Sequence, residues 1–130
     1  MRNLLIGLKI LFMMCLAFPA HAQKAYDVFT YKAMISGTIA RLELADGYLL
    51  ASKVTLHSRS GDKIYAPTAN EPNAAGELKF DLVKGTGHYK DDKGSWLLLK
   101  GLKPEGNSNK ISAVFWNRKM QKAIVFREVN

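Results

Sequence analysis

The side chains that could take part in catalysis or metal binding are few and widely spaced. Beyond the first 22 residues the chain has two histidines, His57 and His88, and no cysteine. Neither histidine belongs to an HExxH motif or to another paired spacing of the kind that zinc sites use. We therefore expect both histidines at the surface, and the sequence predicts no metal and no cofactor.

Two glycine-containing stretches suggest ligand loops. Asp91-Asp92 with Gly94 resembles part of a calcium loop, but no acidic residue stands where the last ligand of an EF-hand should fall. Gly85-Thr86-Gly87 resembles part of a phosphate loop, but no predicted helix follows to offer its N-terminus to an anion. Both stretches are interpreted as turns.

No pattern of nucleophiles or carboxylates indicates catalysis. The chain has no nucleophile elbow, and glycoside hydrolysis needs two acids across a cleft. The carboxylates on predicted strands mostly share the solvent-facing positions, and they are Glu43, Glu77, Asp81 and Glu128. The sequence predicts a protein that is not an enzyme, with a hydrolase whose site is concealed as the least favoured alternative.

Aromatic side chains with a polar end are the remaining candidates for ligand binding. Such rings combine apolar area with an OH or NH group, and they often line small-molecule pockets. Five of them could line a pocket at the mouth of a barrel: Tyr48, Tyr65, Tyr89, Trp96 and Trp116. The alternative is ordinary packing with the polar atom at the rim of the core.

The elements that must position these residues are short strands. The stretch 34–57 contains two strand-like runs joined at Asp46-Gly47, a dipeptide typical of tight hairpin turns. The second run alternates, which predicts Tyr48, Leu50, Val54 and Leu56 on the core face. In the first run, Gly37 is interpreted as a bulge or a strong bend.

Further runs of the same kind follow along the chain. They are separated by turn clusters, and they span 63–66, 77–83, 95–102, 111–117 and 123–129. Before the stretch 34–57, the aromatic and β-branched residues of 23–32 favour one more strand over a short helical turn. With no convincing helix, the sequence predicts an all-β fold, a single antiparallel meander of about eight strands. A meander of this size must protect two edges, which favours a closed or partly open barrel, with a β-sandwich as the alternative.

In architecture alone, such a meander resembles the small ligand-binding barrels of the avidin and lipocalin type. The motifs with which those families contact their ligands are not present, so the resemblance assigns no functional residue. Basic and aromatic residues on a small barrel also resemble oligonucleotide-binding barrels. No basic stripe alternates with aromatics along this sequence, and we expect no nucleic-acid partner.

The N-terminus has the three-part layout of a secretory signal. Arg2 and Lys9 precede an apolar run, Ile10–Phe18, and Ala20-His21-Ala22 supplies the small residues of a cleavage site after Ala22. The apolar run is too short for a membrane anchor, so no transmembrane segment is expected in the mature chain. The residues before Cys15 do not fit a lipoprotein signal, which argues against lipidation there.

The predicted mature chain, 23–130, is long enough for one core and one domain. It holds seventeen basic and eleven acidic side chains, a net charge of +6. We expect a periplasmic or secreted binding module for a small molecule or an envelope component. The alternative is a basic structural or interaction protein of the envelope, without an enclosed ligand site, that contacts anionic surfaces.

Overall fold

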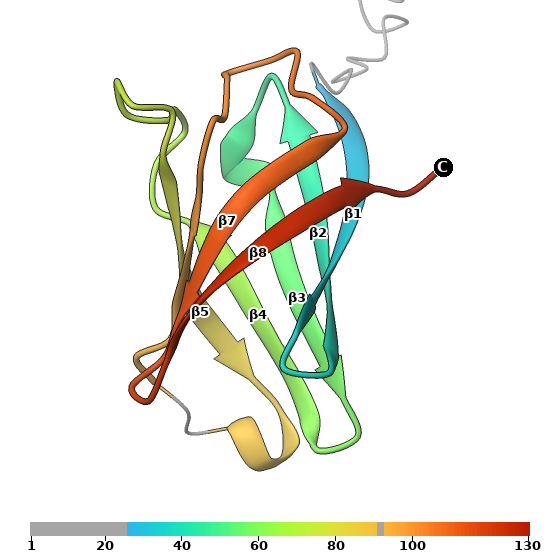
Figure 1. Cartoon of the computed structure of the whole chain (residues 1–130), viewed down its shortest axis with the longest axis vertical. Helices are drawn as coiled ribbons and strands as arrows, with labels where there is room; N and C mark the ends of the chain where they lie inside the picture. Colours follow the sequence, from blue (N-terminus) through green and yellow to red (C-terminus); the bar gives the residue numbers. More distant parts are fainter. Residues whose placement is uncertain (1–25, 91–92) are drawn as a thin grey trace, which may run out of the picture.

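The computed structural model of the chain describes residues 26–90 and 93–130. Within them eight antiparallel strands follow one another around a closed barrel, and β8 pairs with β1 (Figure 1). The strands are β1 (Asp27–Ile35), β2 (Thr38–Asp46), β3 (Lys53–Ser58), β4 (Gly61–Pro67), β5 (Leu78–Gly85), β6 (Trp96–Leu99), β7 (Lys110–Trp116) and β8 (Gln121–Glu128).

The predicted all-β meander is therefore confirmed, and closure into a barrel replaces the sandwich alternative. Closure gives every strand a neighbour on both sides and so shortens the sheet edges open to another chain. The seam between β1 and β8 is the shortest, with Tyr31 paired to Glu128 and Lys32 paired to Arg127. The predicted signal segment 1–22, with Cys15, and the turn residues Asp91-Asp92 lie outside the described residues.

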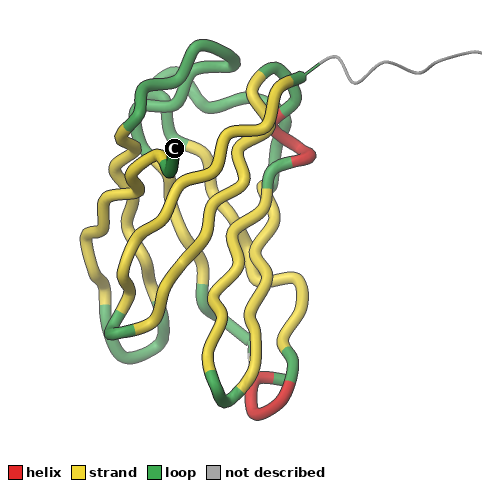
Figure 2. Tube along the Cα trace, turned by 90° about the vertical axis from the view of Figure 1, so that its right-hand side faces the viewer, coloured by secondary structure: helices red, strands yellow, loops and turns green. Residues whose placement is uncertain are grey.

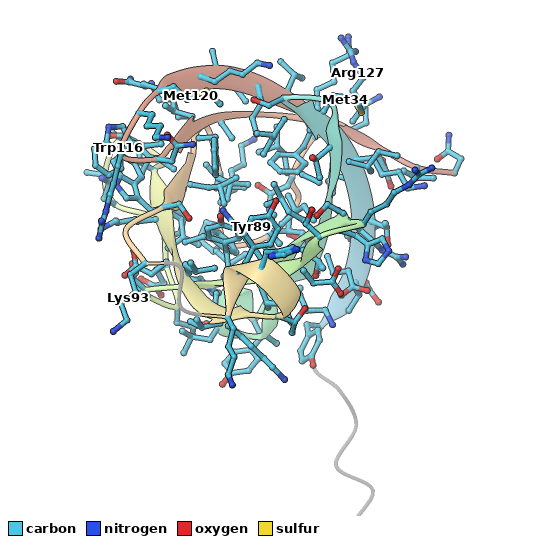
Figure 3. All side chains as sticks on the ribbon, turned by 90° about the horizontal axis from the view of Figure 1, so that it is seen from below. Met34, Tyr89, Lys93, Trp116, Met120 and Arg127 are labelled. Carbon is cyan, nitrogen blue, oxygen red and sulfur yellow. The ribbon has the colours of Figure 1, made fainter. Side chains whose placement is uncertain are left out.

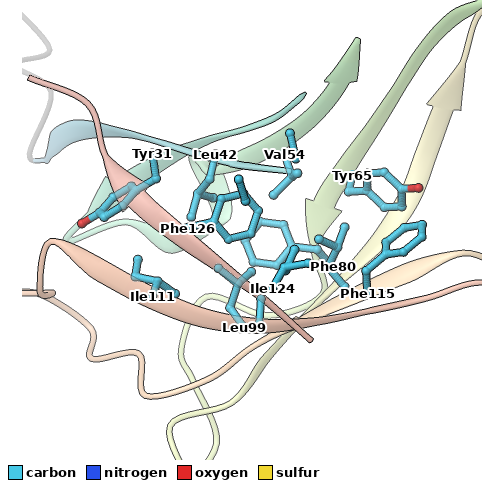
Figure 4. Close-up of a cluster of buried hydrophobic side chains, with 14 of the residues drawn as sticks. Tyr31, Leu42, Val54, Tyr65, Phe80, Leu99, Ile111, Phe115, Ile124 and Phe126 are labelled. Atoms are coloured by element: carbon cyan, nitrogen blue, oxygen red, sulfur yellow. The ribbon is translucent and has the colours of Figure 1, made fainter. Parts of the chain in front are cut away.

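The interior is filled by the inward-facing side chains of all eight strands. An eight-stranded barrel is just wide enough for side chains to fill it. On β5, Leu78 and Phe80 are buried while Lys79 and Val83 are exposed, as the alternation of this strand predicts. Figure 4 shows large apolar side chains from opposite walls meeting in one cluster. The middle of the barrel is thus a packed core.

Between β1 and β2, a tight two-residue hairpin turn is formed by Ser36 and Gly37, and none forms at Asp46-Gly47. Ile35 pairs with Thr38, and the two residues between them have φ angles of 49° and 80°. Positive φ at both central positions is what a type I′ turn requires. The predicted bulge at Gly37 is therefore wrong, because β1 and β2 pair along nine residues each and the reversal falls between them.

The chain after Asp46 also differs from the prediction. Gly47 does adopt positive φ, 95°, but a 3-10 turn, η1 (Leu49–Ala51), follows before β3 begins. Leu49 is buried, whereas Tyr48 and Leu50 are 44% and 45% exposed. The expected core positions of Tyr48 and Leu50 are wrong, since η1 breaks the alternation that a continuous strand would have kept.

The loop between β6 and β7 covers one end of the barrel. The Asp46 carboxylate accepts hydrogen bonds from the Gly106 backbone N–H at 2.9 Å and from Asn107 Nδ2 at 2.8 Å. Tyr31 donates its hydroxyl hydrogen to the Ser108 carbonyl at 2.8 Å. Leu102, in the same loop, is buried. Figure 2 shows loops gathered at this end and at the opposite one. The Asp46 end is therefore tied shut.

Tyr31 makes the stability of this closed end depend on pH in the alkaline range. Burial, followed by the negative charges of Glu128 and Asp46, raises the pKa of Tyr31 above its ordinary 10.0. The phenol is therefore protonated at a higher pH in the folded than in the unfolded chain. The stability that it contributes is intact below about pH 10 and is lost as pH rises through the folded pKa.

We expect Tyr31→Phe to cost about 1 kcal/mol at neutral pH, where it removes the hydrogen bond to Ser108. Urea unfolding of both proteins at increasing alkaline pH should then show this difference narrowing, because only the wild type has a phenol to ionise at this site. A difference that stays constant up to the pH of general alkaline unfolding would contradict the assignment.

Candidate functional site

A cavity of about 250 Å³ opens at the end of the barrel opposite to Asp46. Its buried apolar lining consists of Ile35, Leu56 and Phe115. Figure 3 looks into this end, with Tyr89 near the middle of the view and Met120 at the rim. The remaining described residues that line it are Ser36, Thr38, Ser58, Lys63, Tyr89, Asn117 and Met120. This mouth cavity thus combines an apolar floor with hydroxyl, amide and ammonium groups.

Three turns deliver the polar rim. The turn between β1 and β2 supplies Ser36. Ser58, at the end of β3, donates its hydroxyl hydrogen to the Gly61 carbonyl at 2.9 Å. At the turn between β7 and β8, Asn117 Oδ1 accepts from the backbone N–H groups of Lys119 and Met120, both at 2.9 Å. Side chains that bond to the backbone of their own turn hold the rim in one conformation.

A second 3-10 turn, η2 (Gly87–Tyr89), places Tyr89 at the mouth. In η2, the His88 N–H donates to the Ser60 carbonyl, in the turn between β3 and β4, at 2.8 Å. Just before η2, the Thr86 N–H donates to the Asp62 carbonyl of β4 at 2.9 Å. The Lys63 ammonium lies 4.4 Å from the centre of the Tyr89 ring, within the range of a cation–π contact.

Gly85 and Gly87 make this junction possible. A Cβ atom on Gly85 would lie 1.9 Å from the Tyr89 carbonyl oxygen, and one on Gly87 would lie 2.3 Å from the Ser60 carbonyl oxygen. Both distances are far below van der Waals contact. The glycines of the stretch 85–87 therefore allow two backbone segments to approach closely, which explains a pattern that the sequence alone left as a turn.

Of the five aromatic residues proposed from the sequence, Tyr89 lines the mouth cavity and the other four lie elsewhere. Tyr65 is fully buried in the core, with its hydroxyl 2.8 Å from Ser95 Oγ. Tyr48 lies at the closed end beside Tyr26, with 5.7 Å between the ring centres. A tyrosine in the packed core and one at the closed end do not share a pocket with Tyr89.

Trp96 and Trp116 form a cross-strand pair on the outer wall. They are paired directly between β6 and β7, and their rings stack 5.6 Å apart with 22° between the planes. Their strand neighbours Leu97 and Phe115 point inward and are buried. Lys79 Nζ lies 5.3 Å from the Trp96 ring centre. This pair stabilises the sheet from outside and is separate from the mouth cavity.

Sequence reasoning missed most of the mouth. Ser36, Thr38, Ser58 and Asn117 are common turn residues, and no spacing along the chain relates them to one another. Among the lining residues, only Lys63 and Tyr89 have a chemical character that could be recognised in the sequence. They meet because η2 crosses over β4. The cavity is a product of barrel closure.

The remaining candidates for chemistry lie apart. His57 is on the outer wall, where its Nδ1 contacts the Asp62 carboxylate. Glu43 is paired with Lys53 at 3.2 Å and with Arg41 at 3.6 Å. Within residues 26–90 and 93–130, no three His, Cys, Asp or Glu side chains gather closely enough to hold a metal ion.

Two wider observations complete the description. Over the described part of the chain, no helix has the length and apolar character needed to cross a membrane. Comparison of the chain with protein-family models, with curated proteins and with solved structures finds no match.

Proposed function

We propose that this chain is an exported, non-enzymatic binding domain of the periplasm or cell envelope, and that it holds a small molecule at the open end of its barrel. The observation that carries the proposal is the mouth cavity, which has an apolar floor and a polar rim at one end of a barrel whose other end is tied shut. This combination is typical of small-molecule sites.

The lining suggests the class of ligand. Ile35, Leu56 and Phe115 favour an apolar portion, and the hydroxyl and amide groups of the rim favour hydrogen-bonding atoms at its outer end. The volume of about 250 Å³ is just below the roughly 300–1,000 Å³ of drug-sized pockets. The ligand is therefore a small amphiphilic molecule.

Binding without catalysis is supported by the composition of the lining. Its described members include no histidine, aspartate or glutamate beside the serine and threonine hydroxyls. Activating such a hydroxyl as a nucleophile requires a neighbouring base. The amine in the lining, that of Lys63, lies against the Tyr89 ring, 4.4 Å from its centre. Hydrogen-bond donors and acceptors over an apolar floor are sufficient to orient a ligand.

The export part of the proposal rests on the N-terminal sequence, from Arg2 to the small residues before Gln23. The intact mass of the protein recovered from its own cell envelope or medium tests it directly. The expected mass is that of a chain beginning at Gln23. A mass that includes the N-terminal segment, or a lipid on Cys15, contradicts it.

Ligand binding is tested by filling the cavity. Thr38 lines the mouth on the inward-facing positions of β2 and is half-buried, so Thr38→Trp places a large ring in the opening. NMR titration with short-chain alcohols, carboxylates and amines should shift the amides of Ser36, Leu56 and Tyr89 in the wild type. We expect Thr38→Trp to abolish these shifts while changing the free energy of unfolding by less than about 1.5 kcal/mol.

Thr55→Trp is the matched control, because Thr55 faces outward on β3, the neighbouring strand. It should leave the titration unchanged. The head group that produces the strongest shifts identifies the ligand class. Equal shifts in wild type and Thr38→Trp, or none at mouth residues with any of the three head groups, would count against the proposed site.

A further inference from the structure

Three cations lie in one row across the outer wall of β8, β1 and β2. Lys32 on β1 is paired directly with Arg41 on β2 and with Arg127 on β8. Neighbouring strands are about 4.8 Å apart, and like charges directly opposite each other destabilise a sheet. The row therefore opposes folding locally, which favours a role in binding an anion.

Lys110 on β7 is paired directly with Arg127 and continues this row, whereas two other outward lysines are compensated. Lys79 pairs with Asp81 at 3.2 Å on β5, and Lys53 pairs with Glu43 at 3.2 Å. Among the described residues, Glu43 is the carboxylate that forms an ion pair with the row, 3.6 Å from Arg41. Within the described residues neither Lys32 nor Arg127 forms an ion pair. The row keeps a net positive charge, although these residues are far apart in the sequence.

An aliphatic strip lies beside the cations. Met34 is paired directly with Ile39, and the two side chains are 56% and 51% exposed. Val125, 42% exposed, lines the same shallow hollow as Met34, Lys32 and Arg127. Figure 3 shows Met34 and Arg127 near each other on the outside of the barrel. We call Lys32, Arg41, Arg127, Met34, Ile39 and Val125 together the basic face.

A second hollow extends the basic face toward β3. It has a volume of about 730 Å³ and is lined by Lys32, Ile39 and Arg41 of the basic face. It adds the cation Arg59 and the ion pair between Lys53 and Glu43. Its described lining, like that of the hollow beside Val125, includes no Phe, Tyr or Trp. Sugars and bases are usually held by stacking on such rings, whereas exposed aliphatic side chains suit the boundary between lipid head groups and acyl chains.

We propose that the basic face docks the protein onto bilayers that contain anionic phospholipid. Lys32, Arg41 and Arg127 contact lipid phosphates, and the aliphatic strip enters the head-group layer. The strip adjoins the turn between β1 and β2, and Ser36 of that turn lines the mouth cavity. Docking thus brings the open end of the barrel close to the membrane. This docking proposal does not depend on whether the mouth cavity holds a ligand.

Flotation of the full chain with phosphatidylcholine vesicles, with and without phosphatidylglycerol, tests the proposal. Wild type should bind the anionic vesicles more tightly than the uncharged ones, and this preference should weaken as salt is added. Replacing Lys32, Arg41 and Arg127 by Gln should weaken binding roughly 100-fold, since each Lys or Arg near an anionic surface contributes about fivefold. The midpoint of thermal unfolding should stay the same or rise, because like-charge neighbours are removed.

A control variant replaces three exposed lysines away from the basic face, Lys84, Lys100 and Lys103, by Gln. The control has the same net charge and the same N-terminal segment as the first variant. A difference in vesicle binding between the two variants therefore cannot come from net charge or from the N-terminal segment. The control should retain wild-type binding within about twofold to threefold. Equal loss of binding in the two variants would show that net charge alone is responsible, and it would overturn the proposal.

The aliphatic strip is tested separately by Met34→Thr combined with Ile39→Thr. We expect vesicle binding to weaken about tenfold or more, as expected for removing buried apolar area, with its salt dependence unchanged. Two results together would refute docking onto a bilayer. The Thr variant would bind vesicles as tightly as the wild type does, and soluble polyphosphate would displace both proteins from the vesicles. The basic face would then be a site for a soluble polyanion.

Discussion

Replacing Phe80 by Ala is expected to lower the free energy of unfolding by about 3–5 kcal/mol, which is a large part of the roughly 5–15 kcal/mol that stabilises a domain of this size. The Phe80 side chain is fully buried, and side chains from several walls surround it in the centre of the barrel (Figure 4). A closed, hydrogen-bonded barrel cannot collapse around a large cavity. Urea unfolding followed by circular dichroism measures the change.

Val83→Ala on the same strand is the matched control. Val83 is 61% exposed, and its replacement should change the free energy of unfolding by about 0.5 kcal/mol or less. A similar small loss for Phe80→Ala would mean that the interior of the barrel is not packed as the structure has it.

The second large effect is expected at Gly85. Its Cβ position lies 1.9 Å from the Tyr89 carbonyl oxygen, so Gly85→Ala must displace η2 or separate it from β5. We expect a loss of about 3 kcal/mol or more, at or above the usual range for overpacking, because backbone atoms must move. The amide signals of Thr86 and Tyr89 should shift strongly, since the mouth is rearranged.

Gly101→Ala separates this contact from a general intolerance of alanine at glycine positions. Gly101 has a φ angle of 67° and no atom within 4 Å of its Cβ position. The expected cost is only the strain of a left-handed backbone, about 1–2 kcal/mol. If Gly85→Ala costs no more than Gly101→Ala, the close approach of η2 to β5 does not exist in solution.

Alternation along single strands was predictable from the sequence. Val54 and Leu56 were expected on the core face of β3, and the structure buries both. Leu78 and Phe80 follow the same rule on β5. Neighbouring residues on a strand point to opposite faces whatever the strand pairs with. This local rule, with the number of strands, was enough to predict a single meander, with a closed or partly open barrel favoured over a sandwich.

The position of the first reversal was not predictable in the same way. Asp46-Gly47 is the stronger turn sequence, yet the tight turn forms at Ser36-Gly37. Asp46 instead anchors the distant loop residues Gly106 and Asn107. Local turn preference was overruled by long-range contacts that close one end of the barrel.

By itself, the sequence determined which side chains of a strand enter the core, because the two-residue period of a strand is a property of adjacent residues. Only the tertiary structure decided which side chains lie together on the surface and at the mouth of the barrel. The cations Lys32, Arg41 and Arg127 look scattered along the chain, and they form one row only because of the register between β8, β1 and β2. The mouth cavity likewise collects residues from separate turns. Register and closure depend on pairing between distant segments, and no local pattern encodes them.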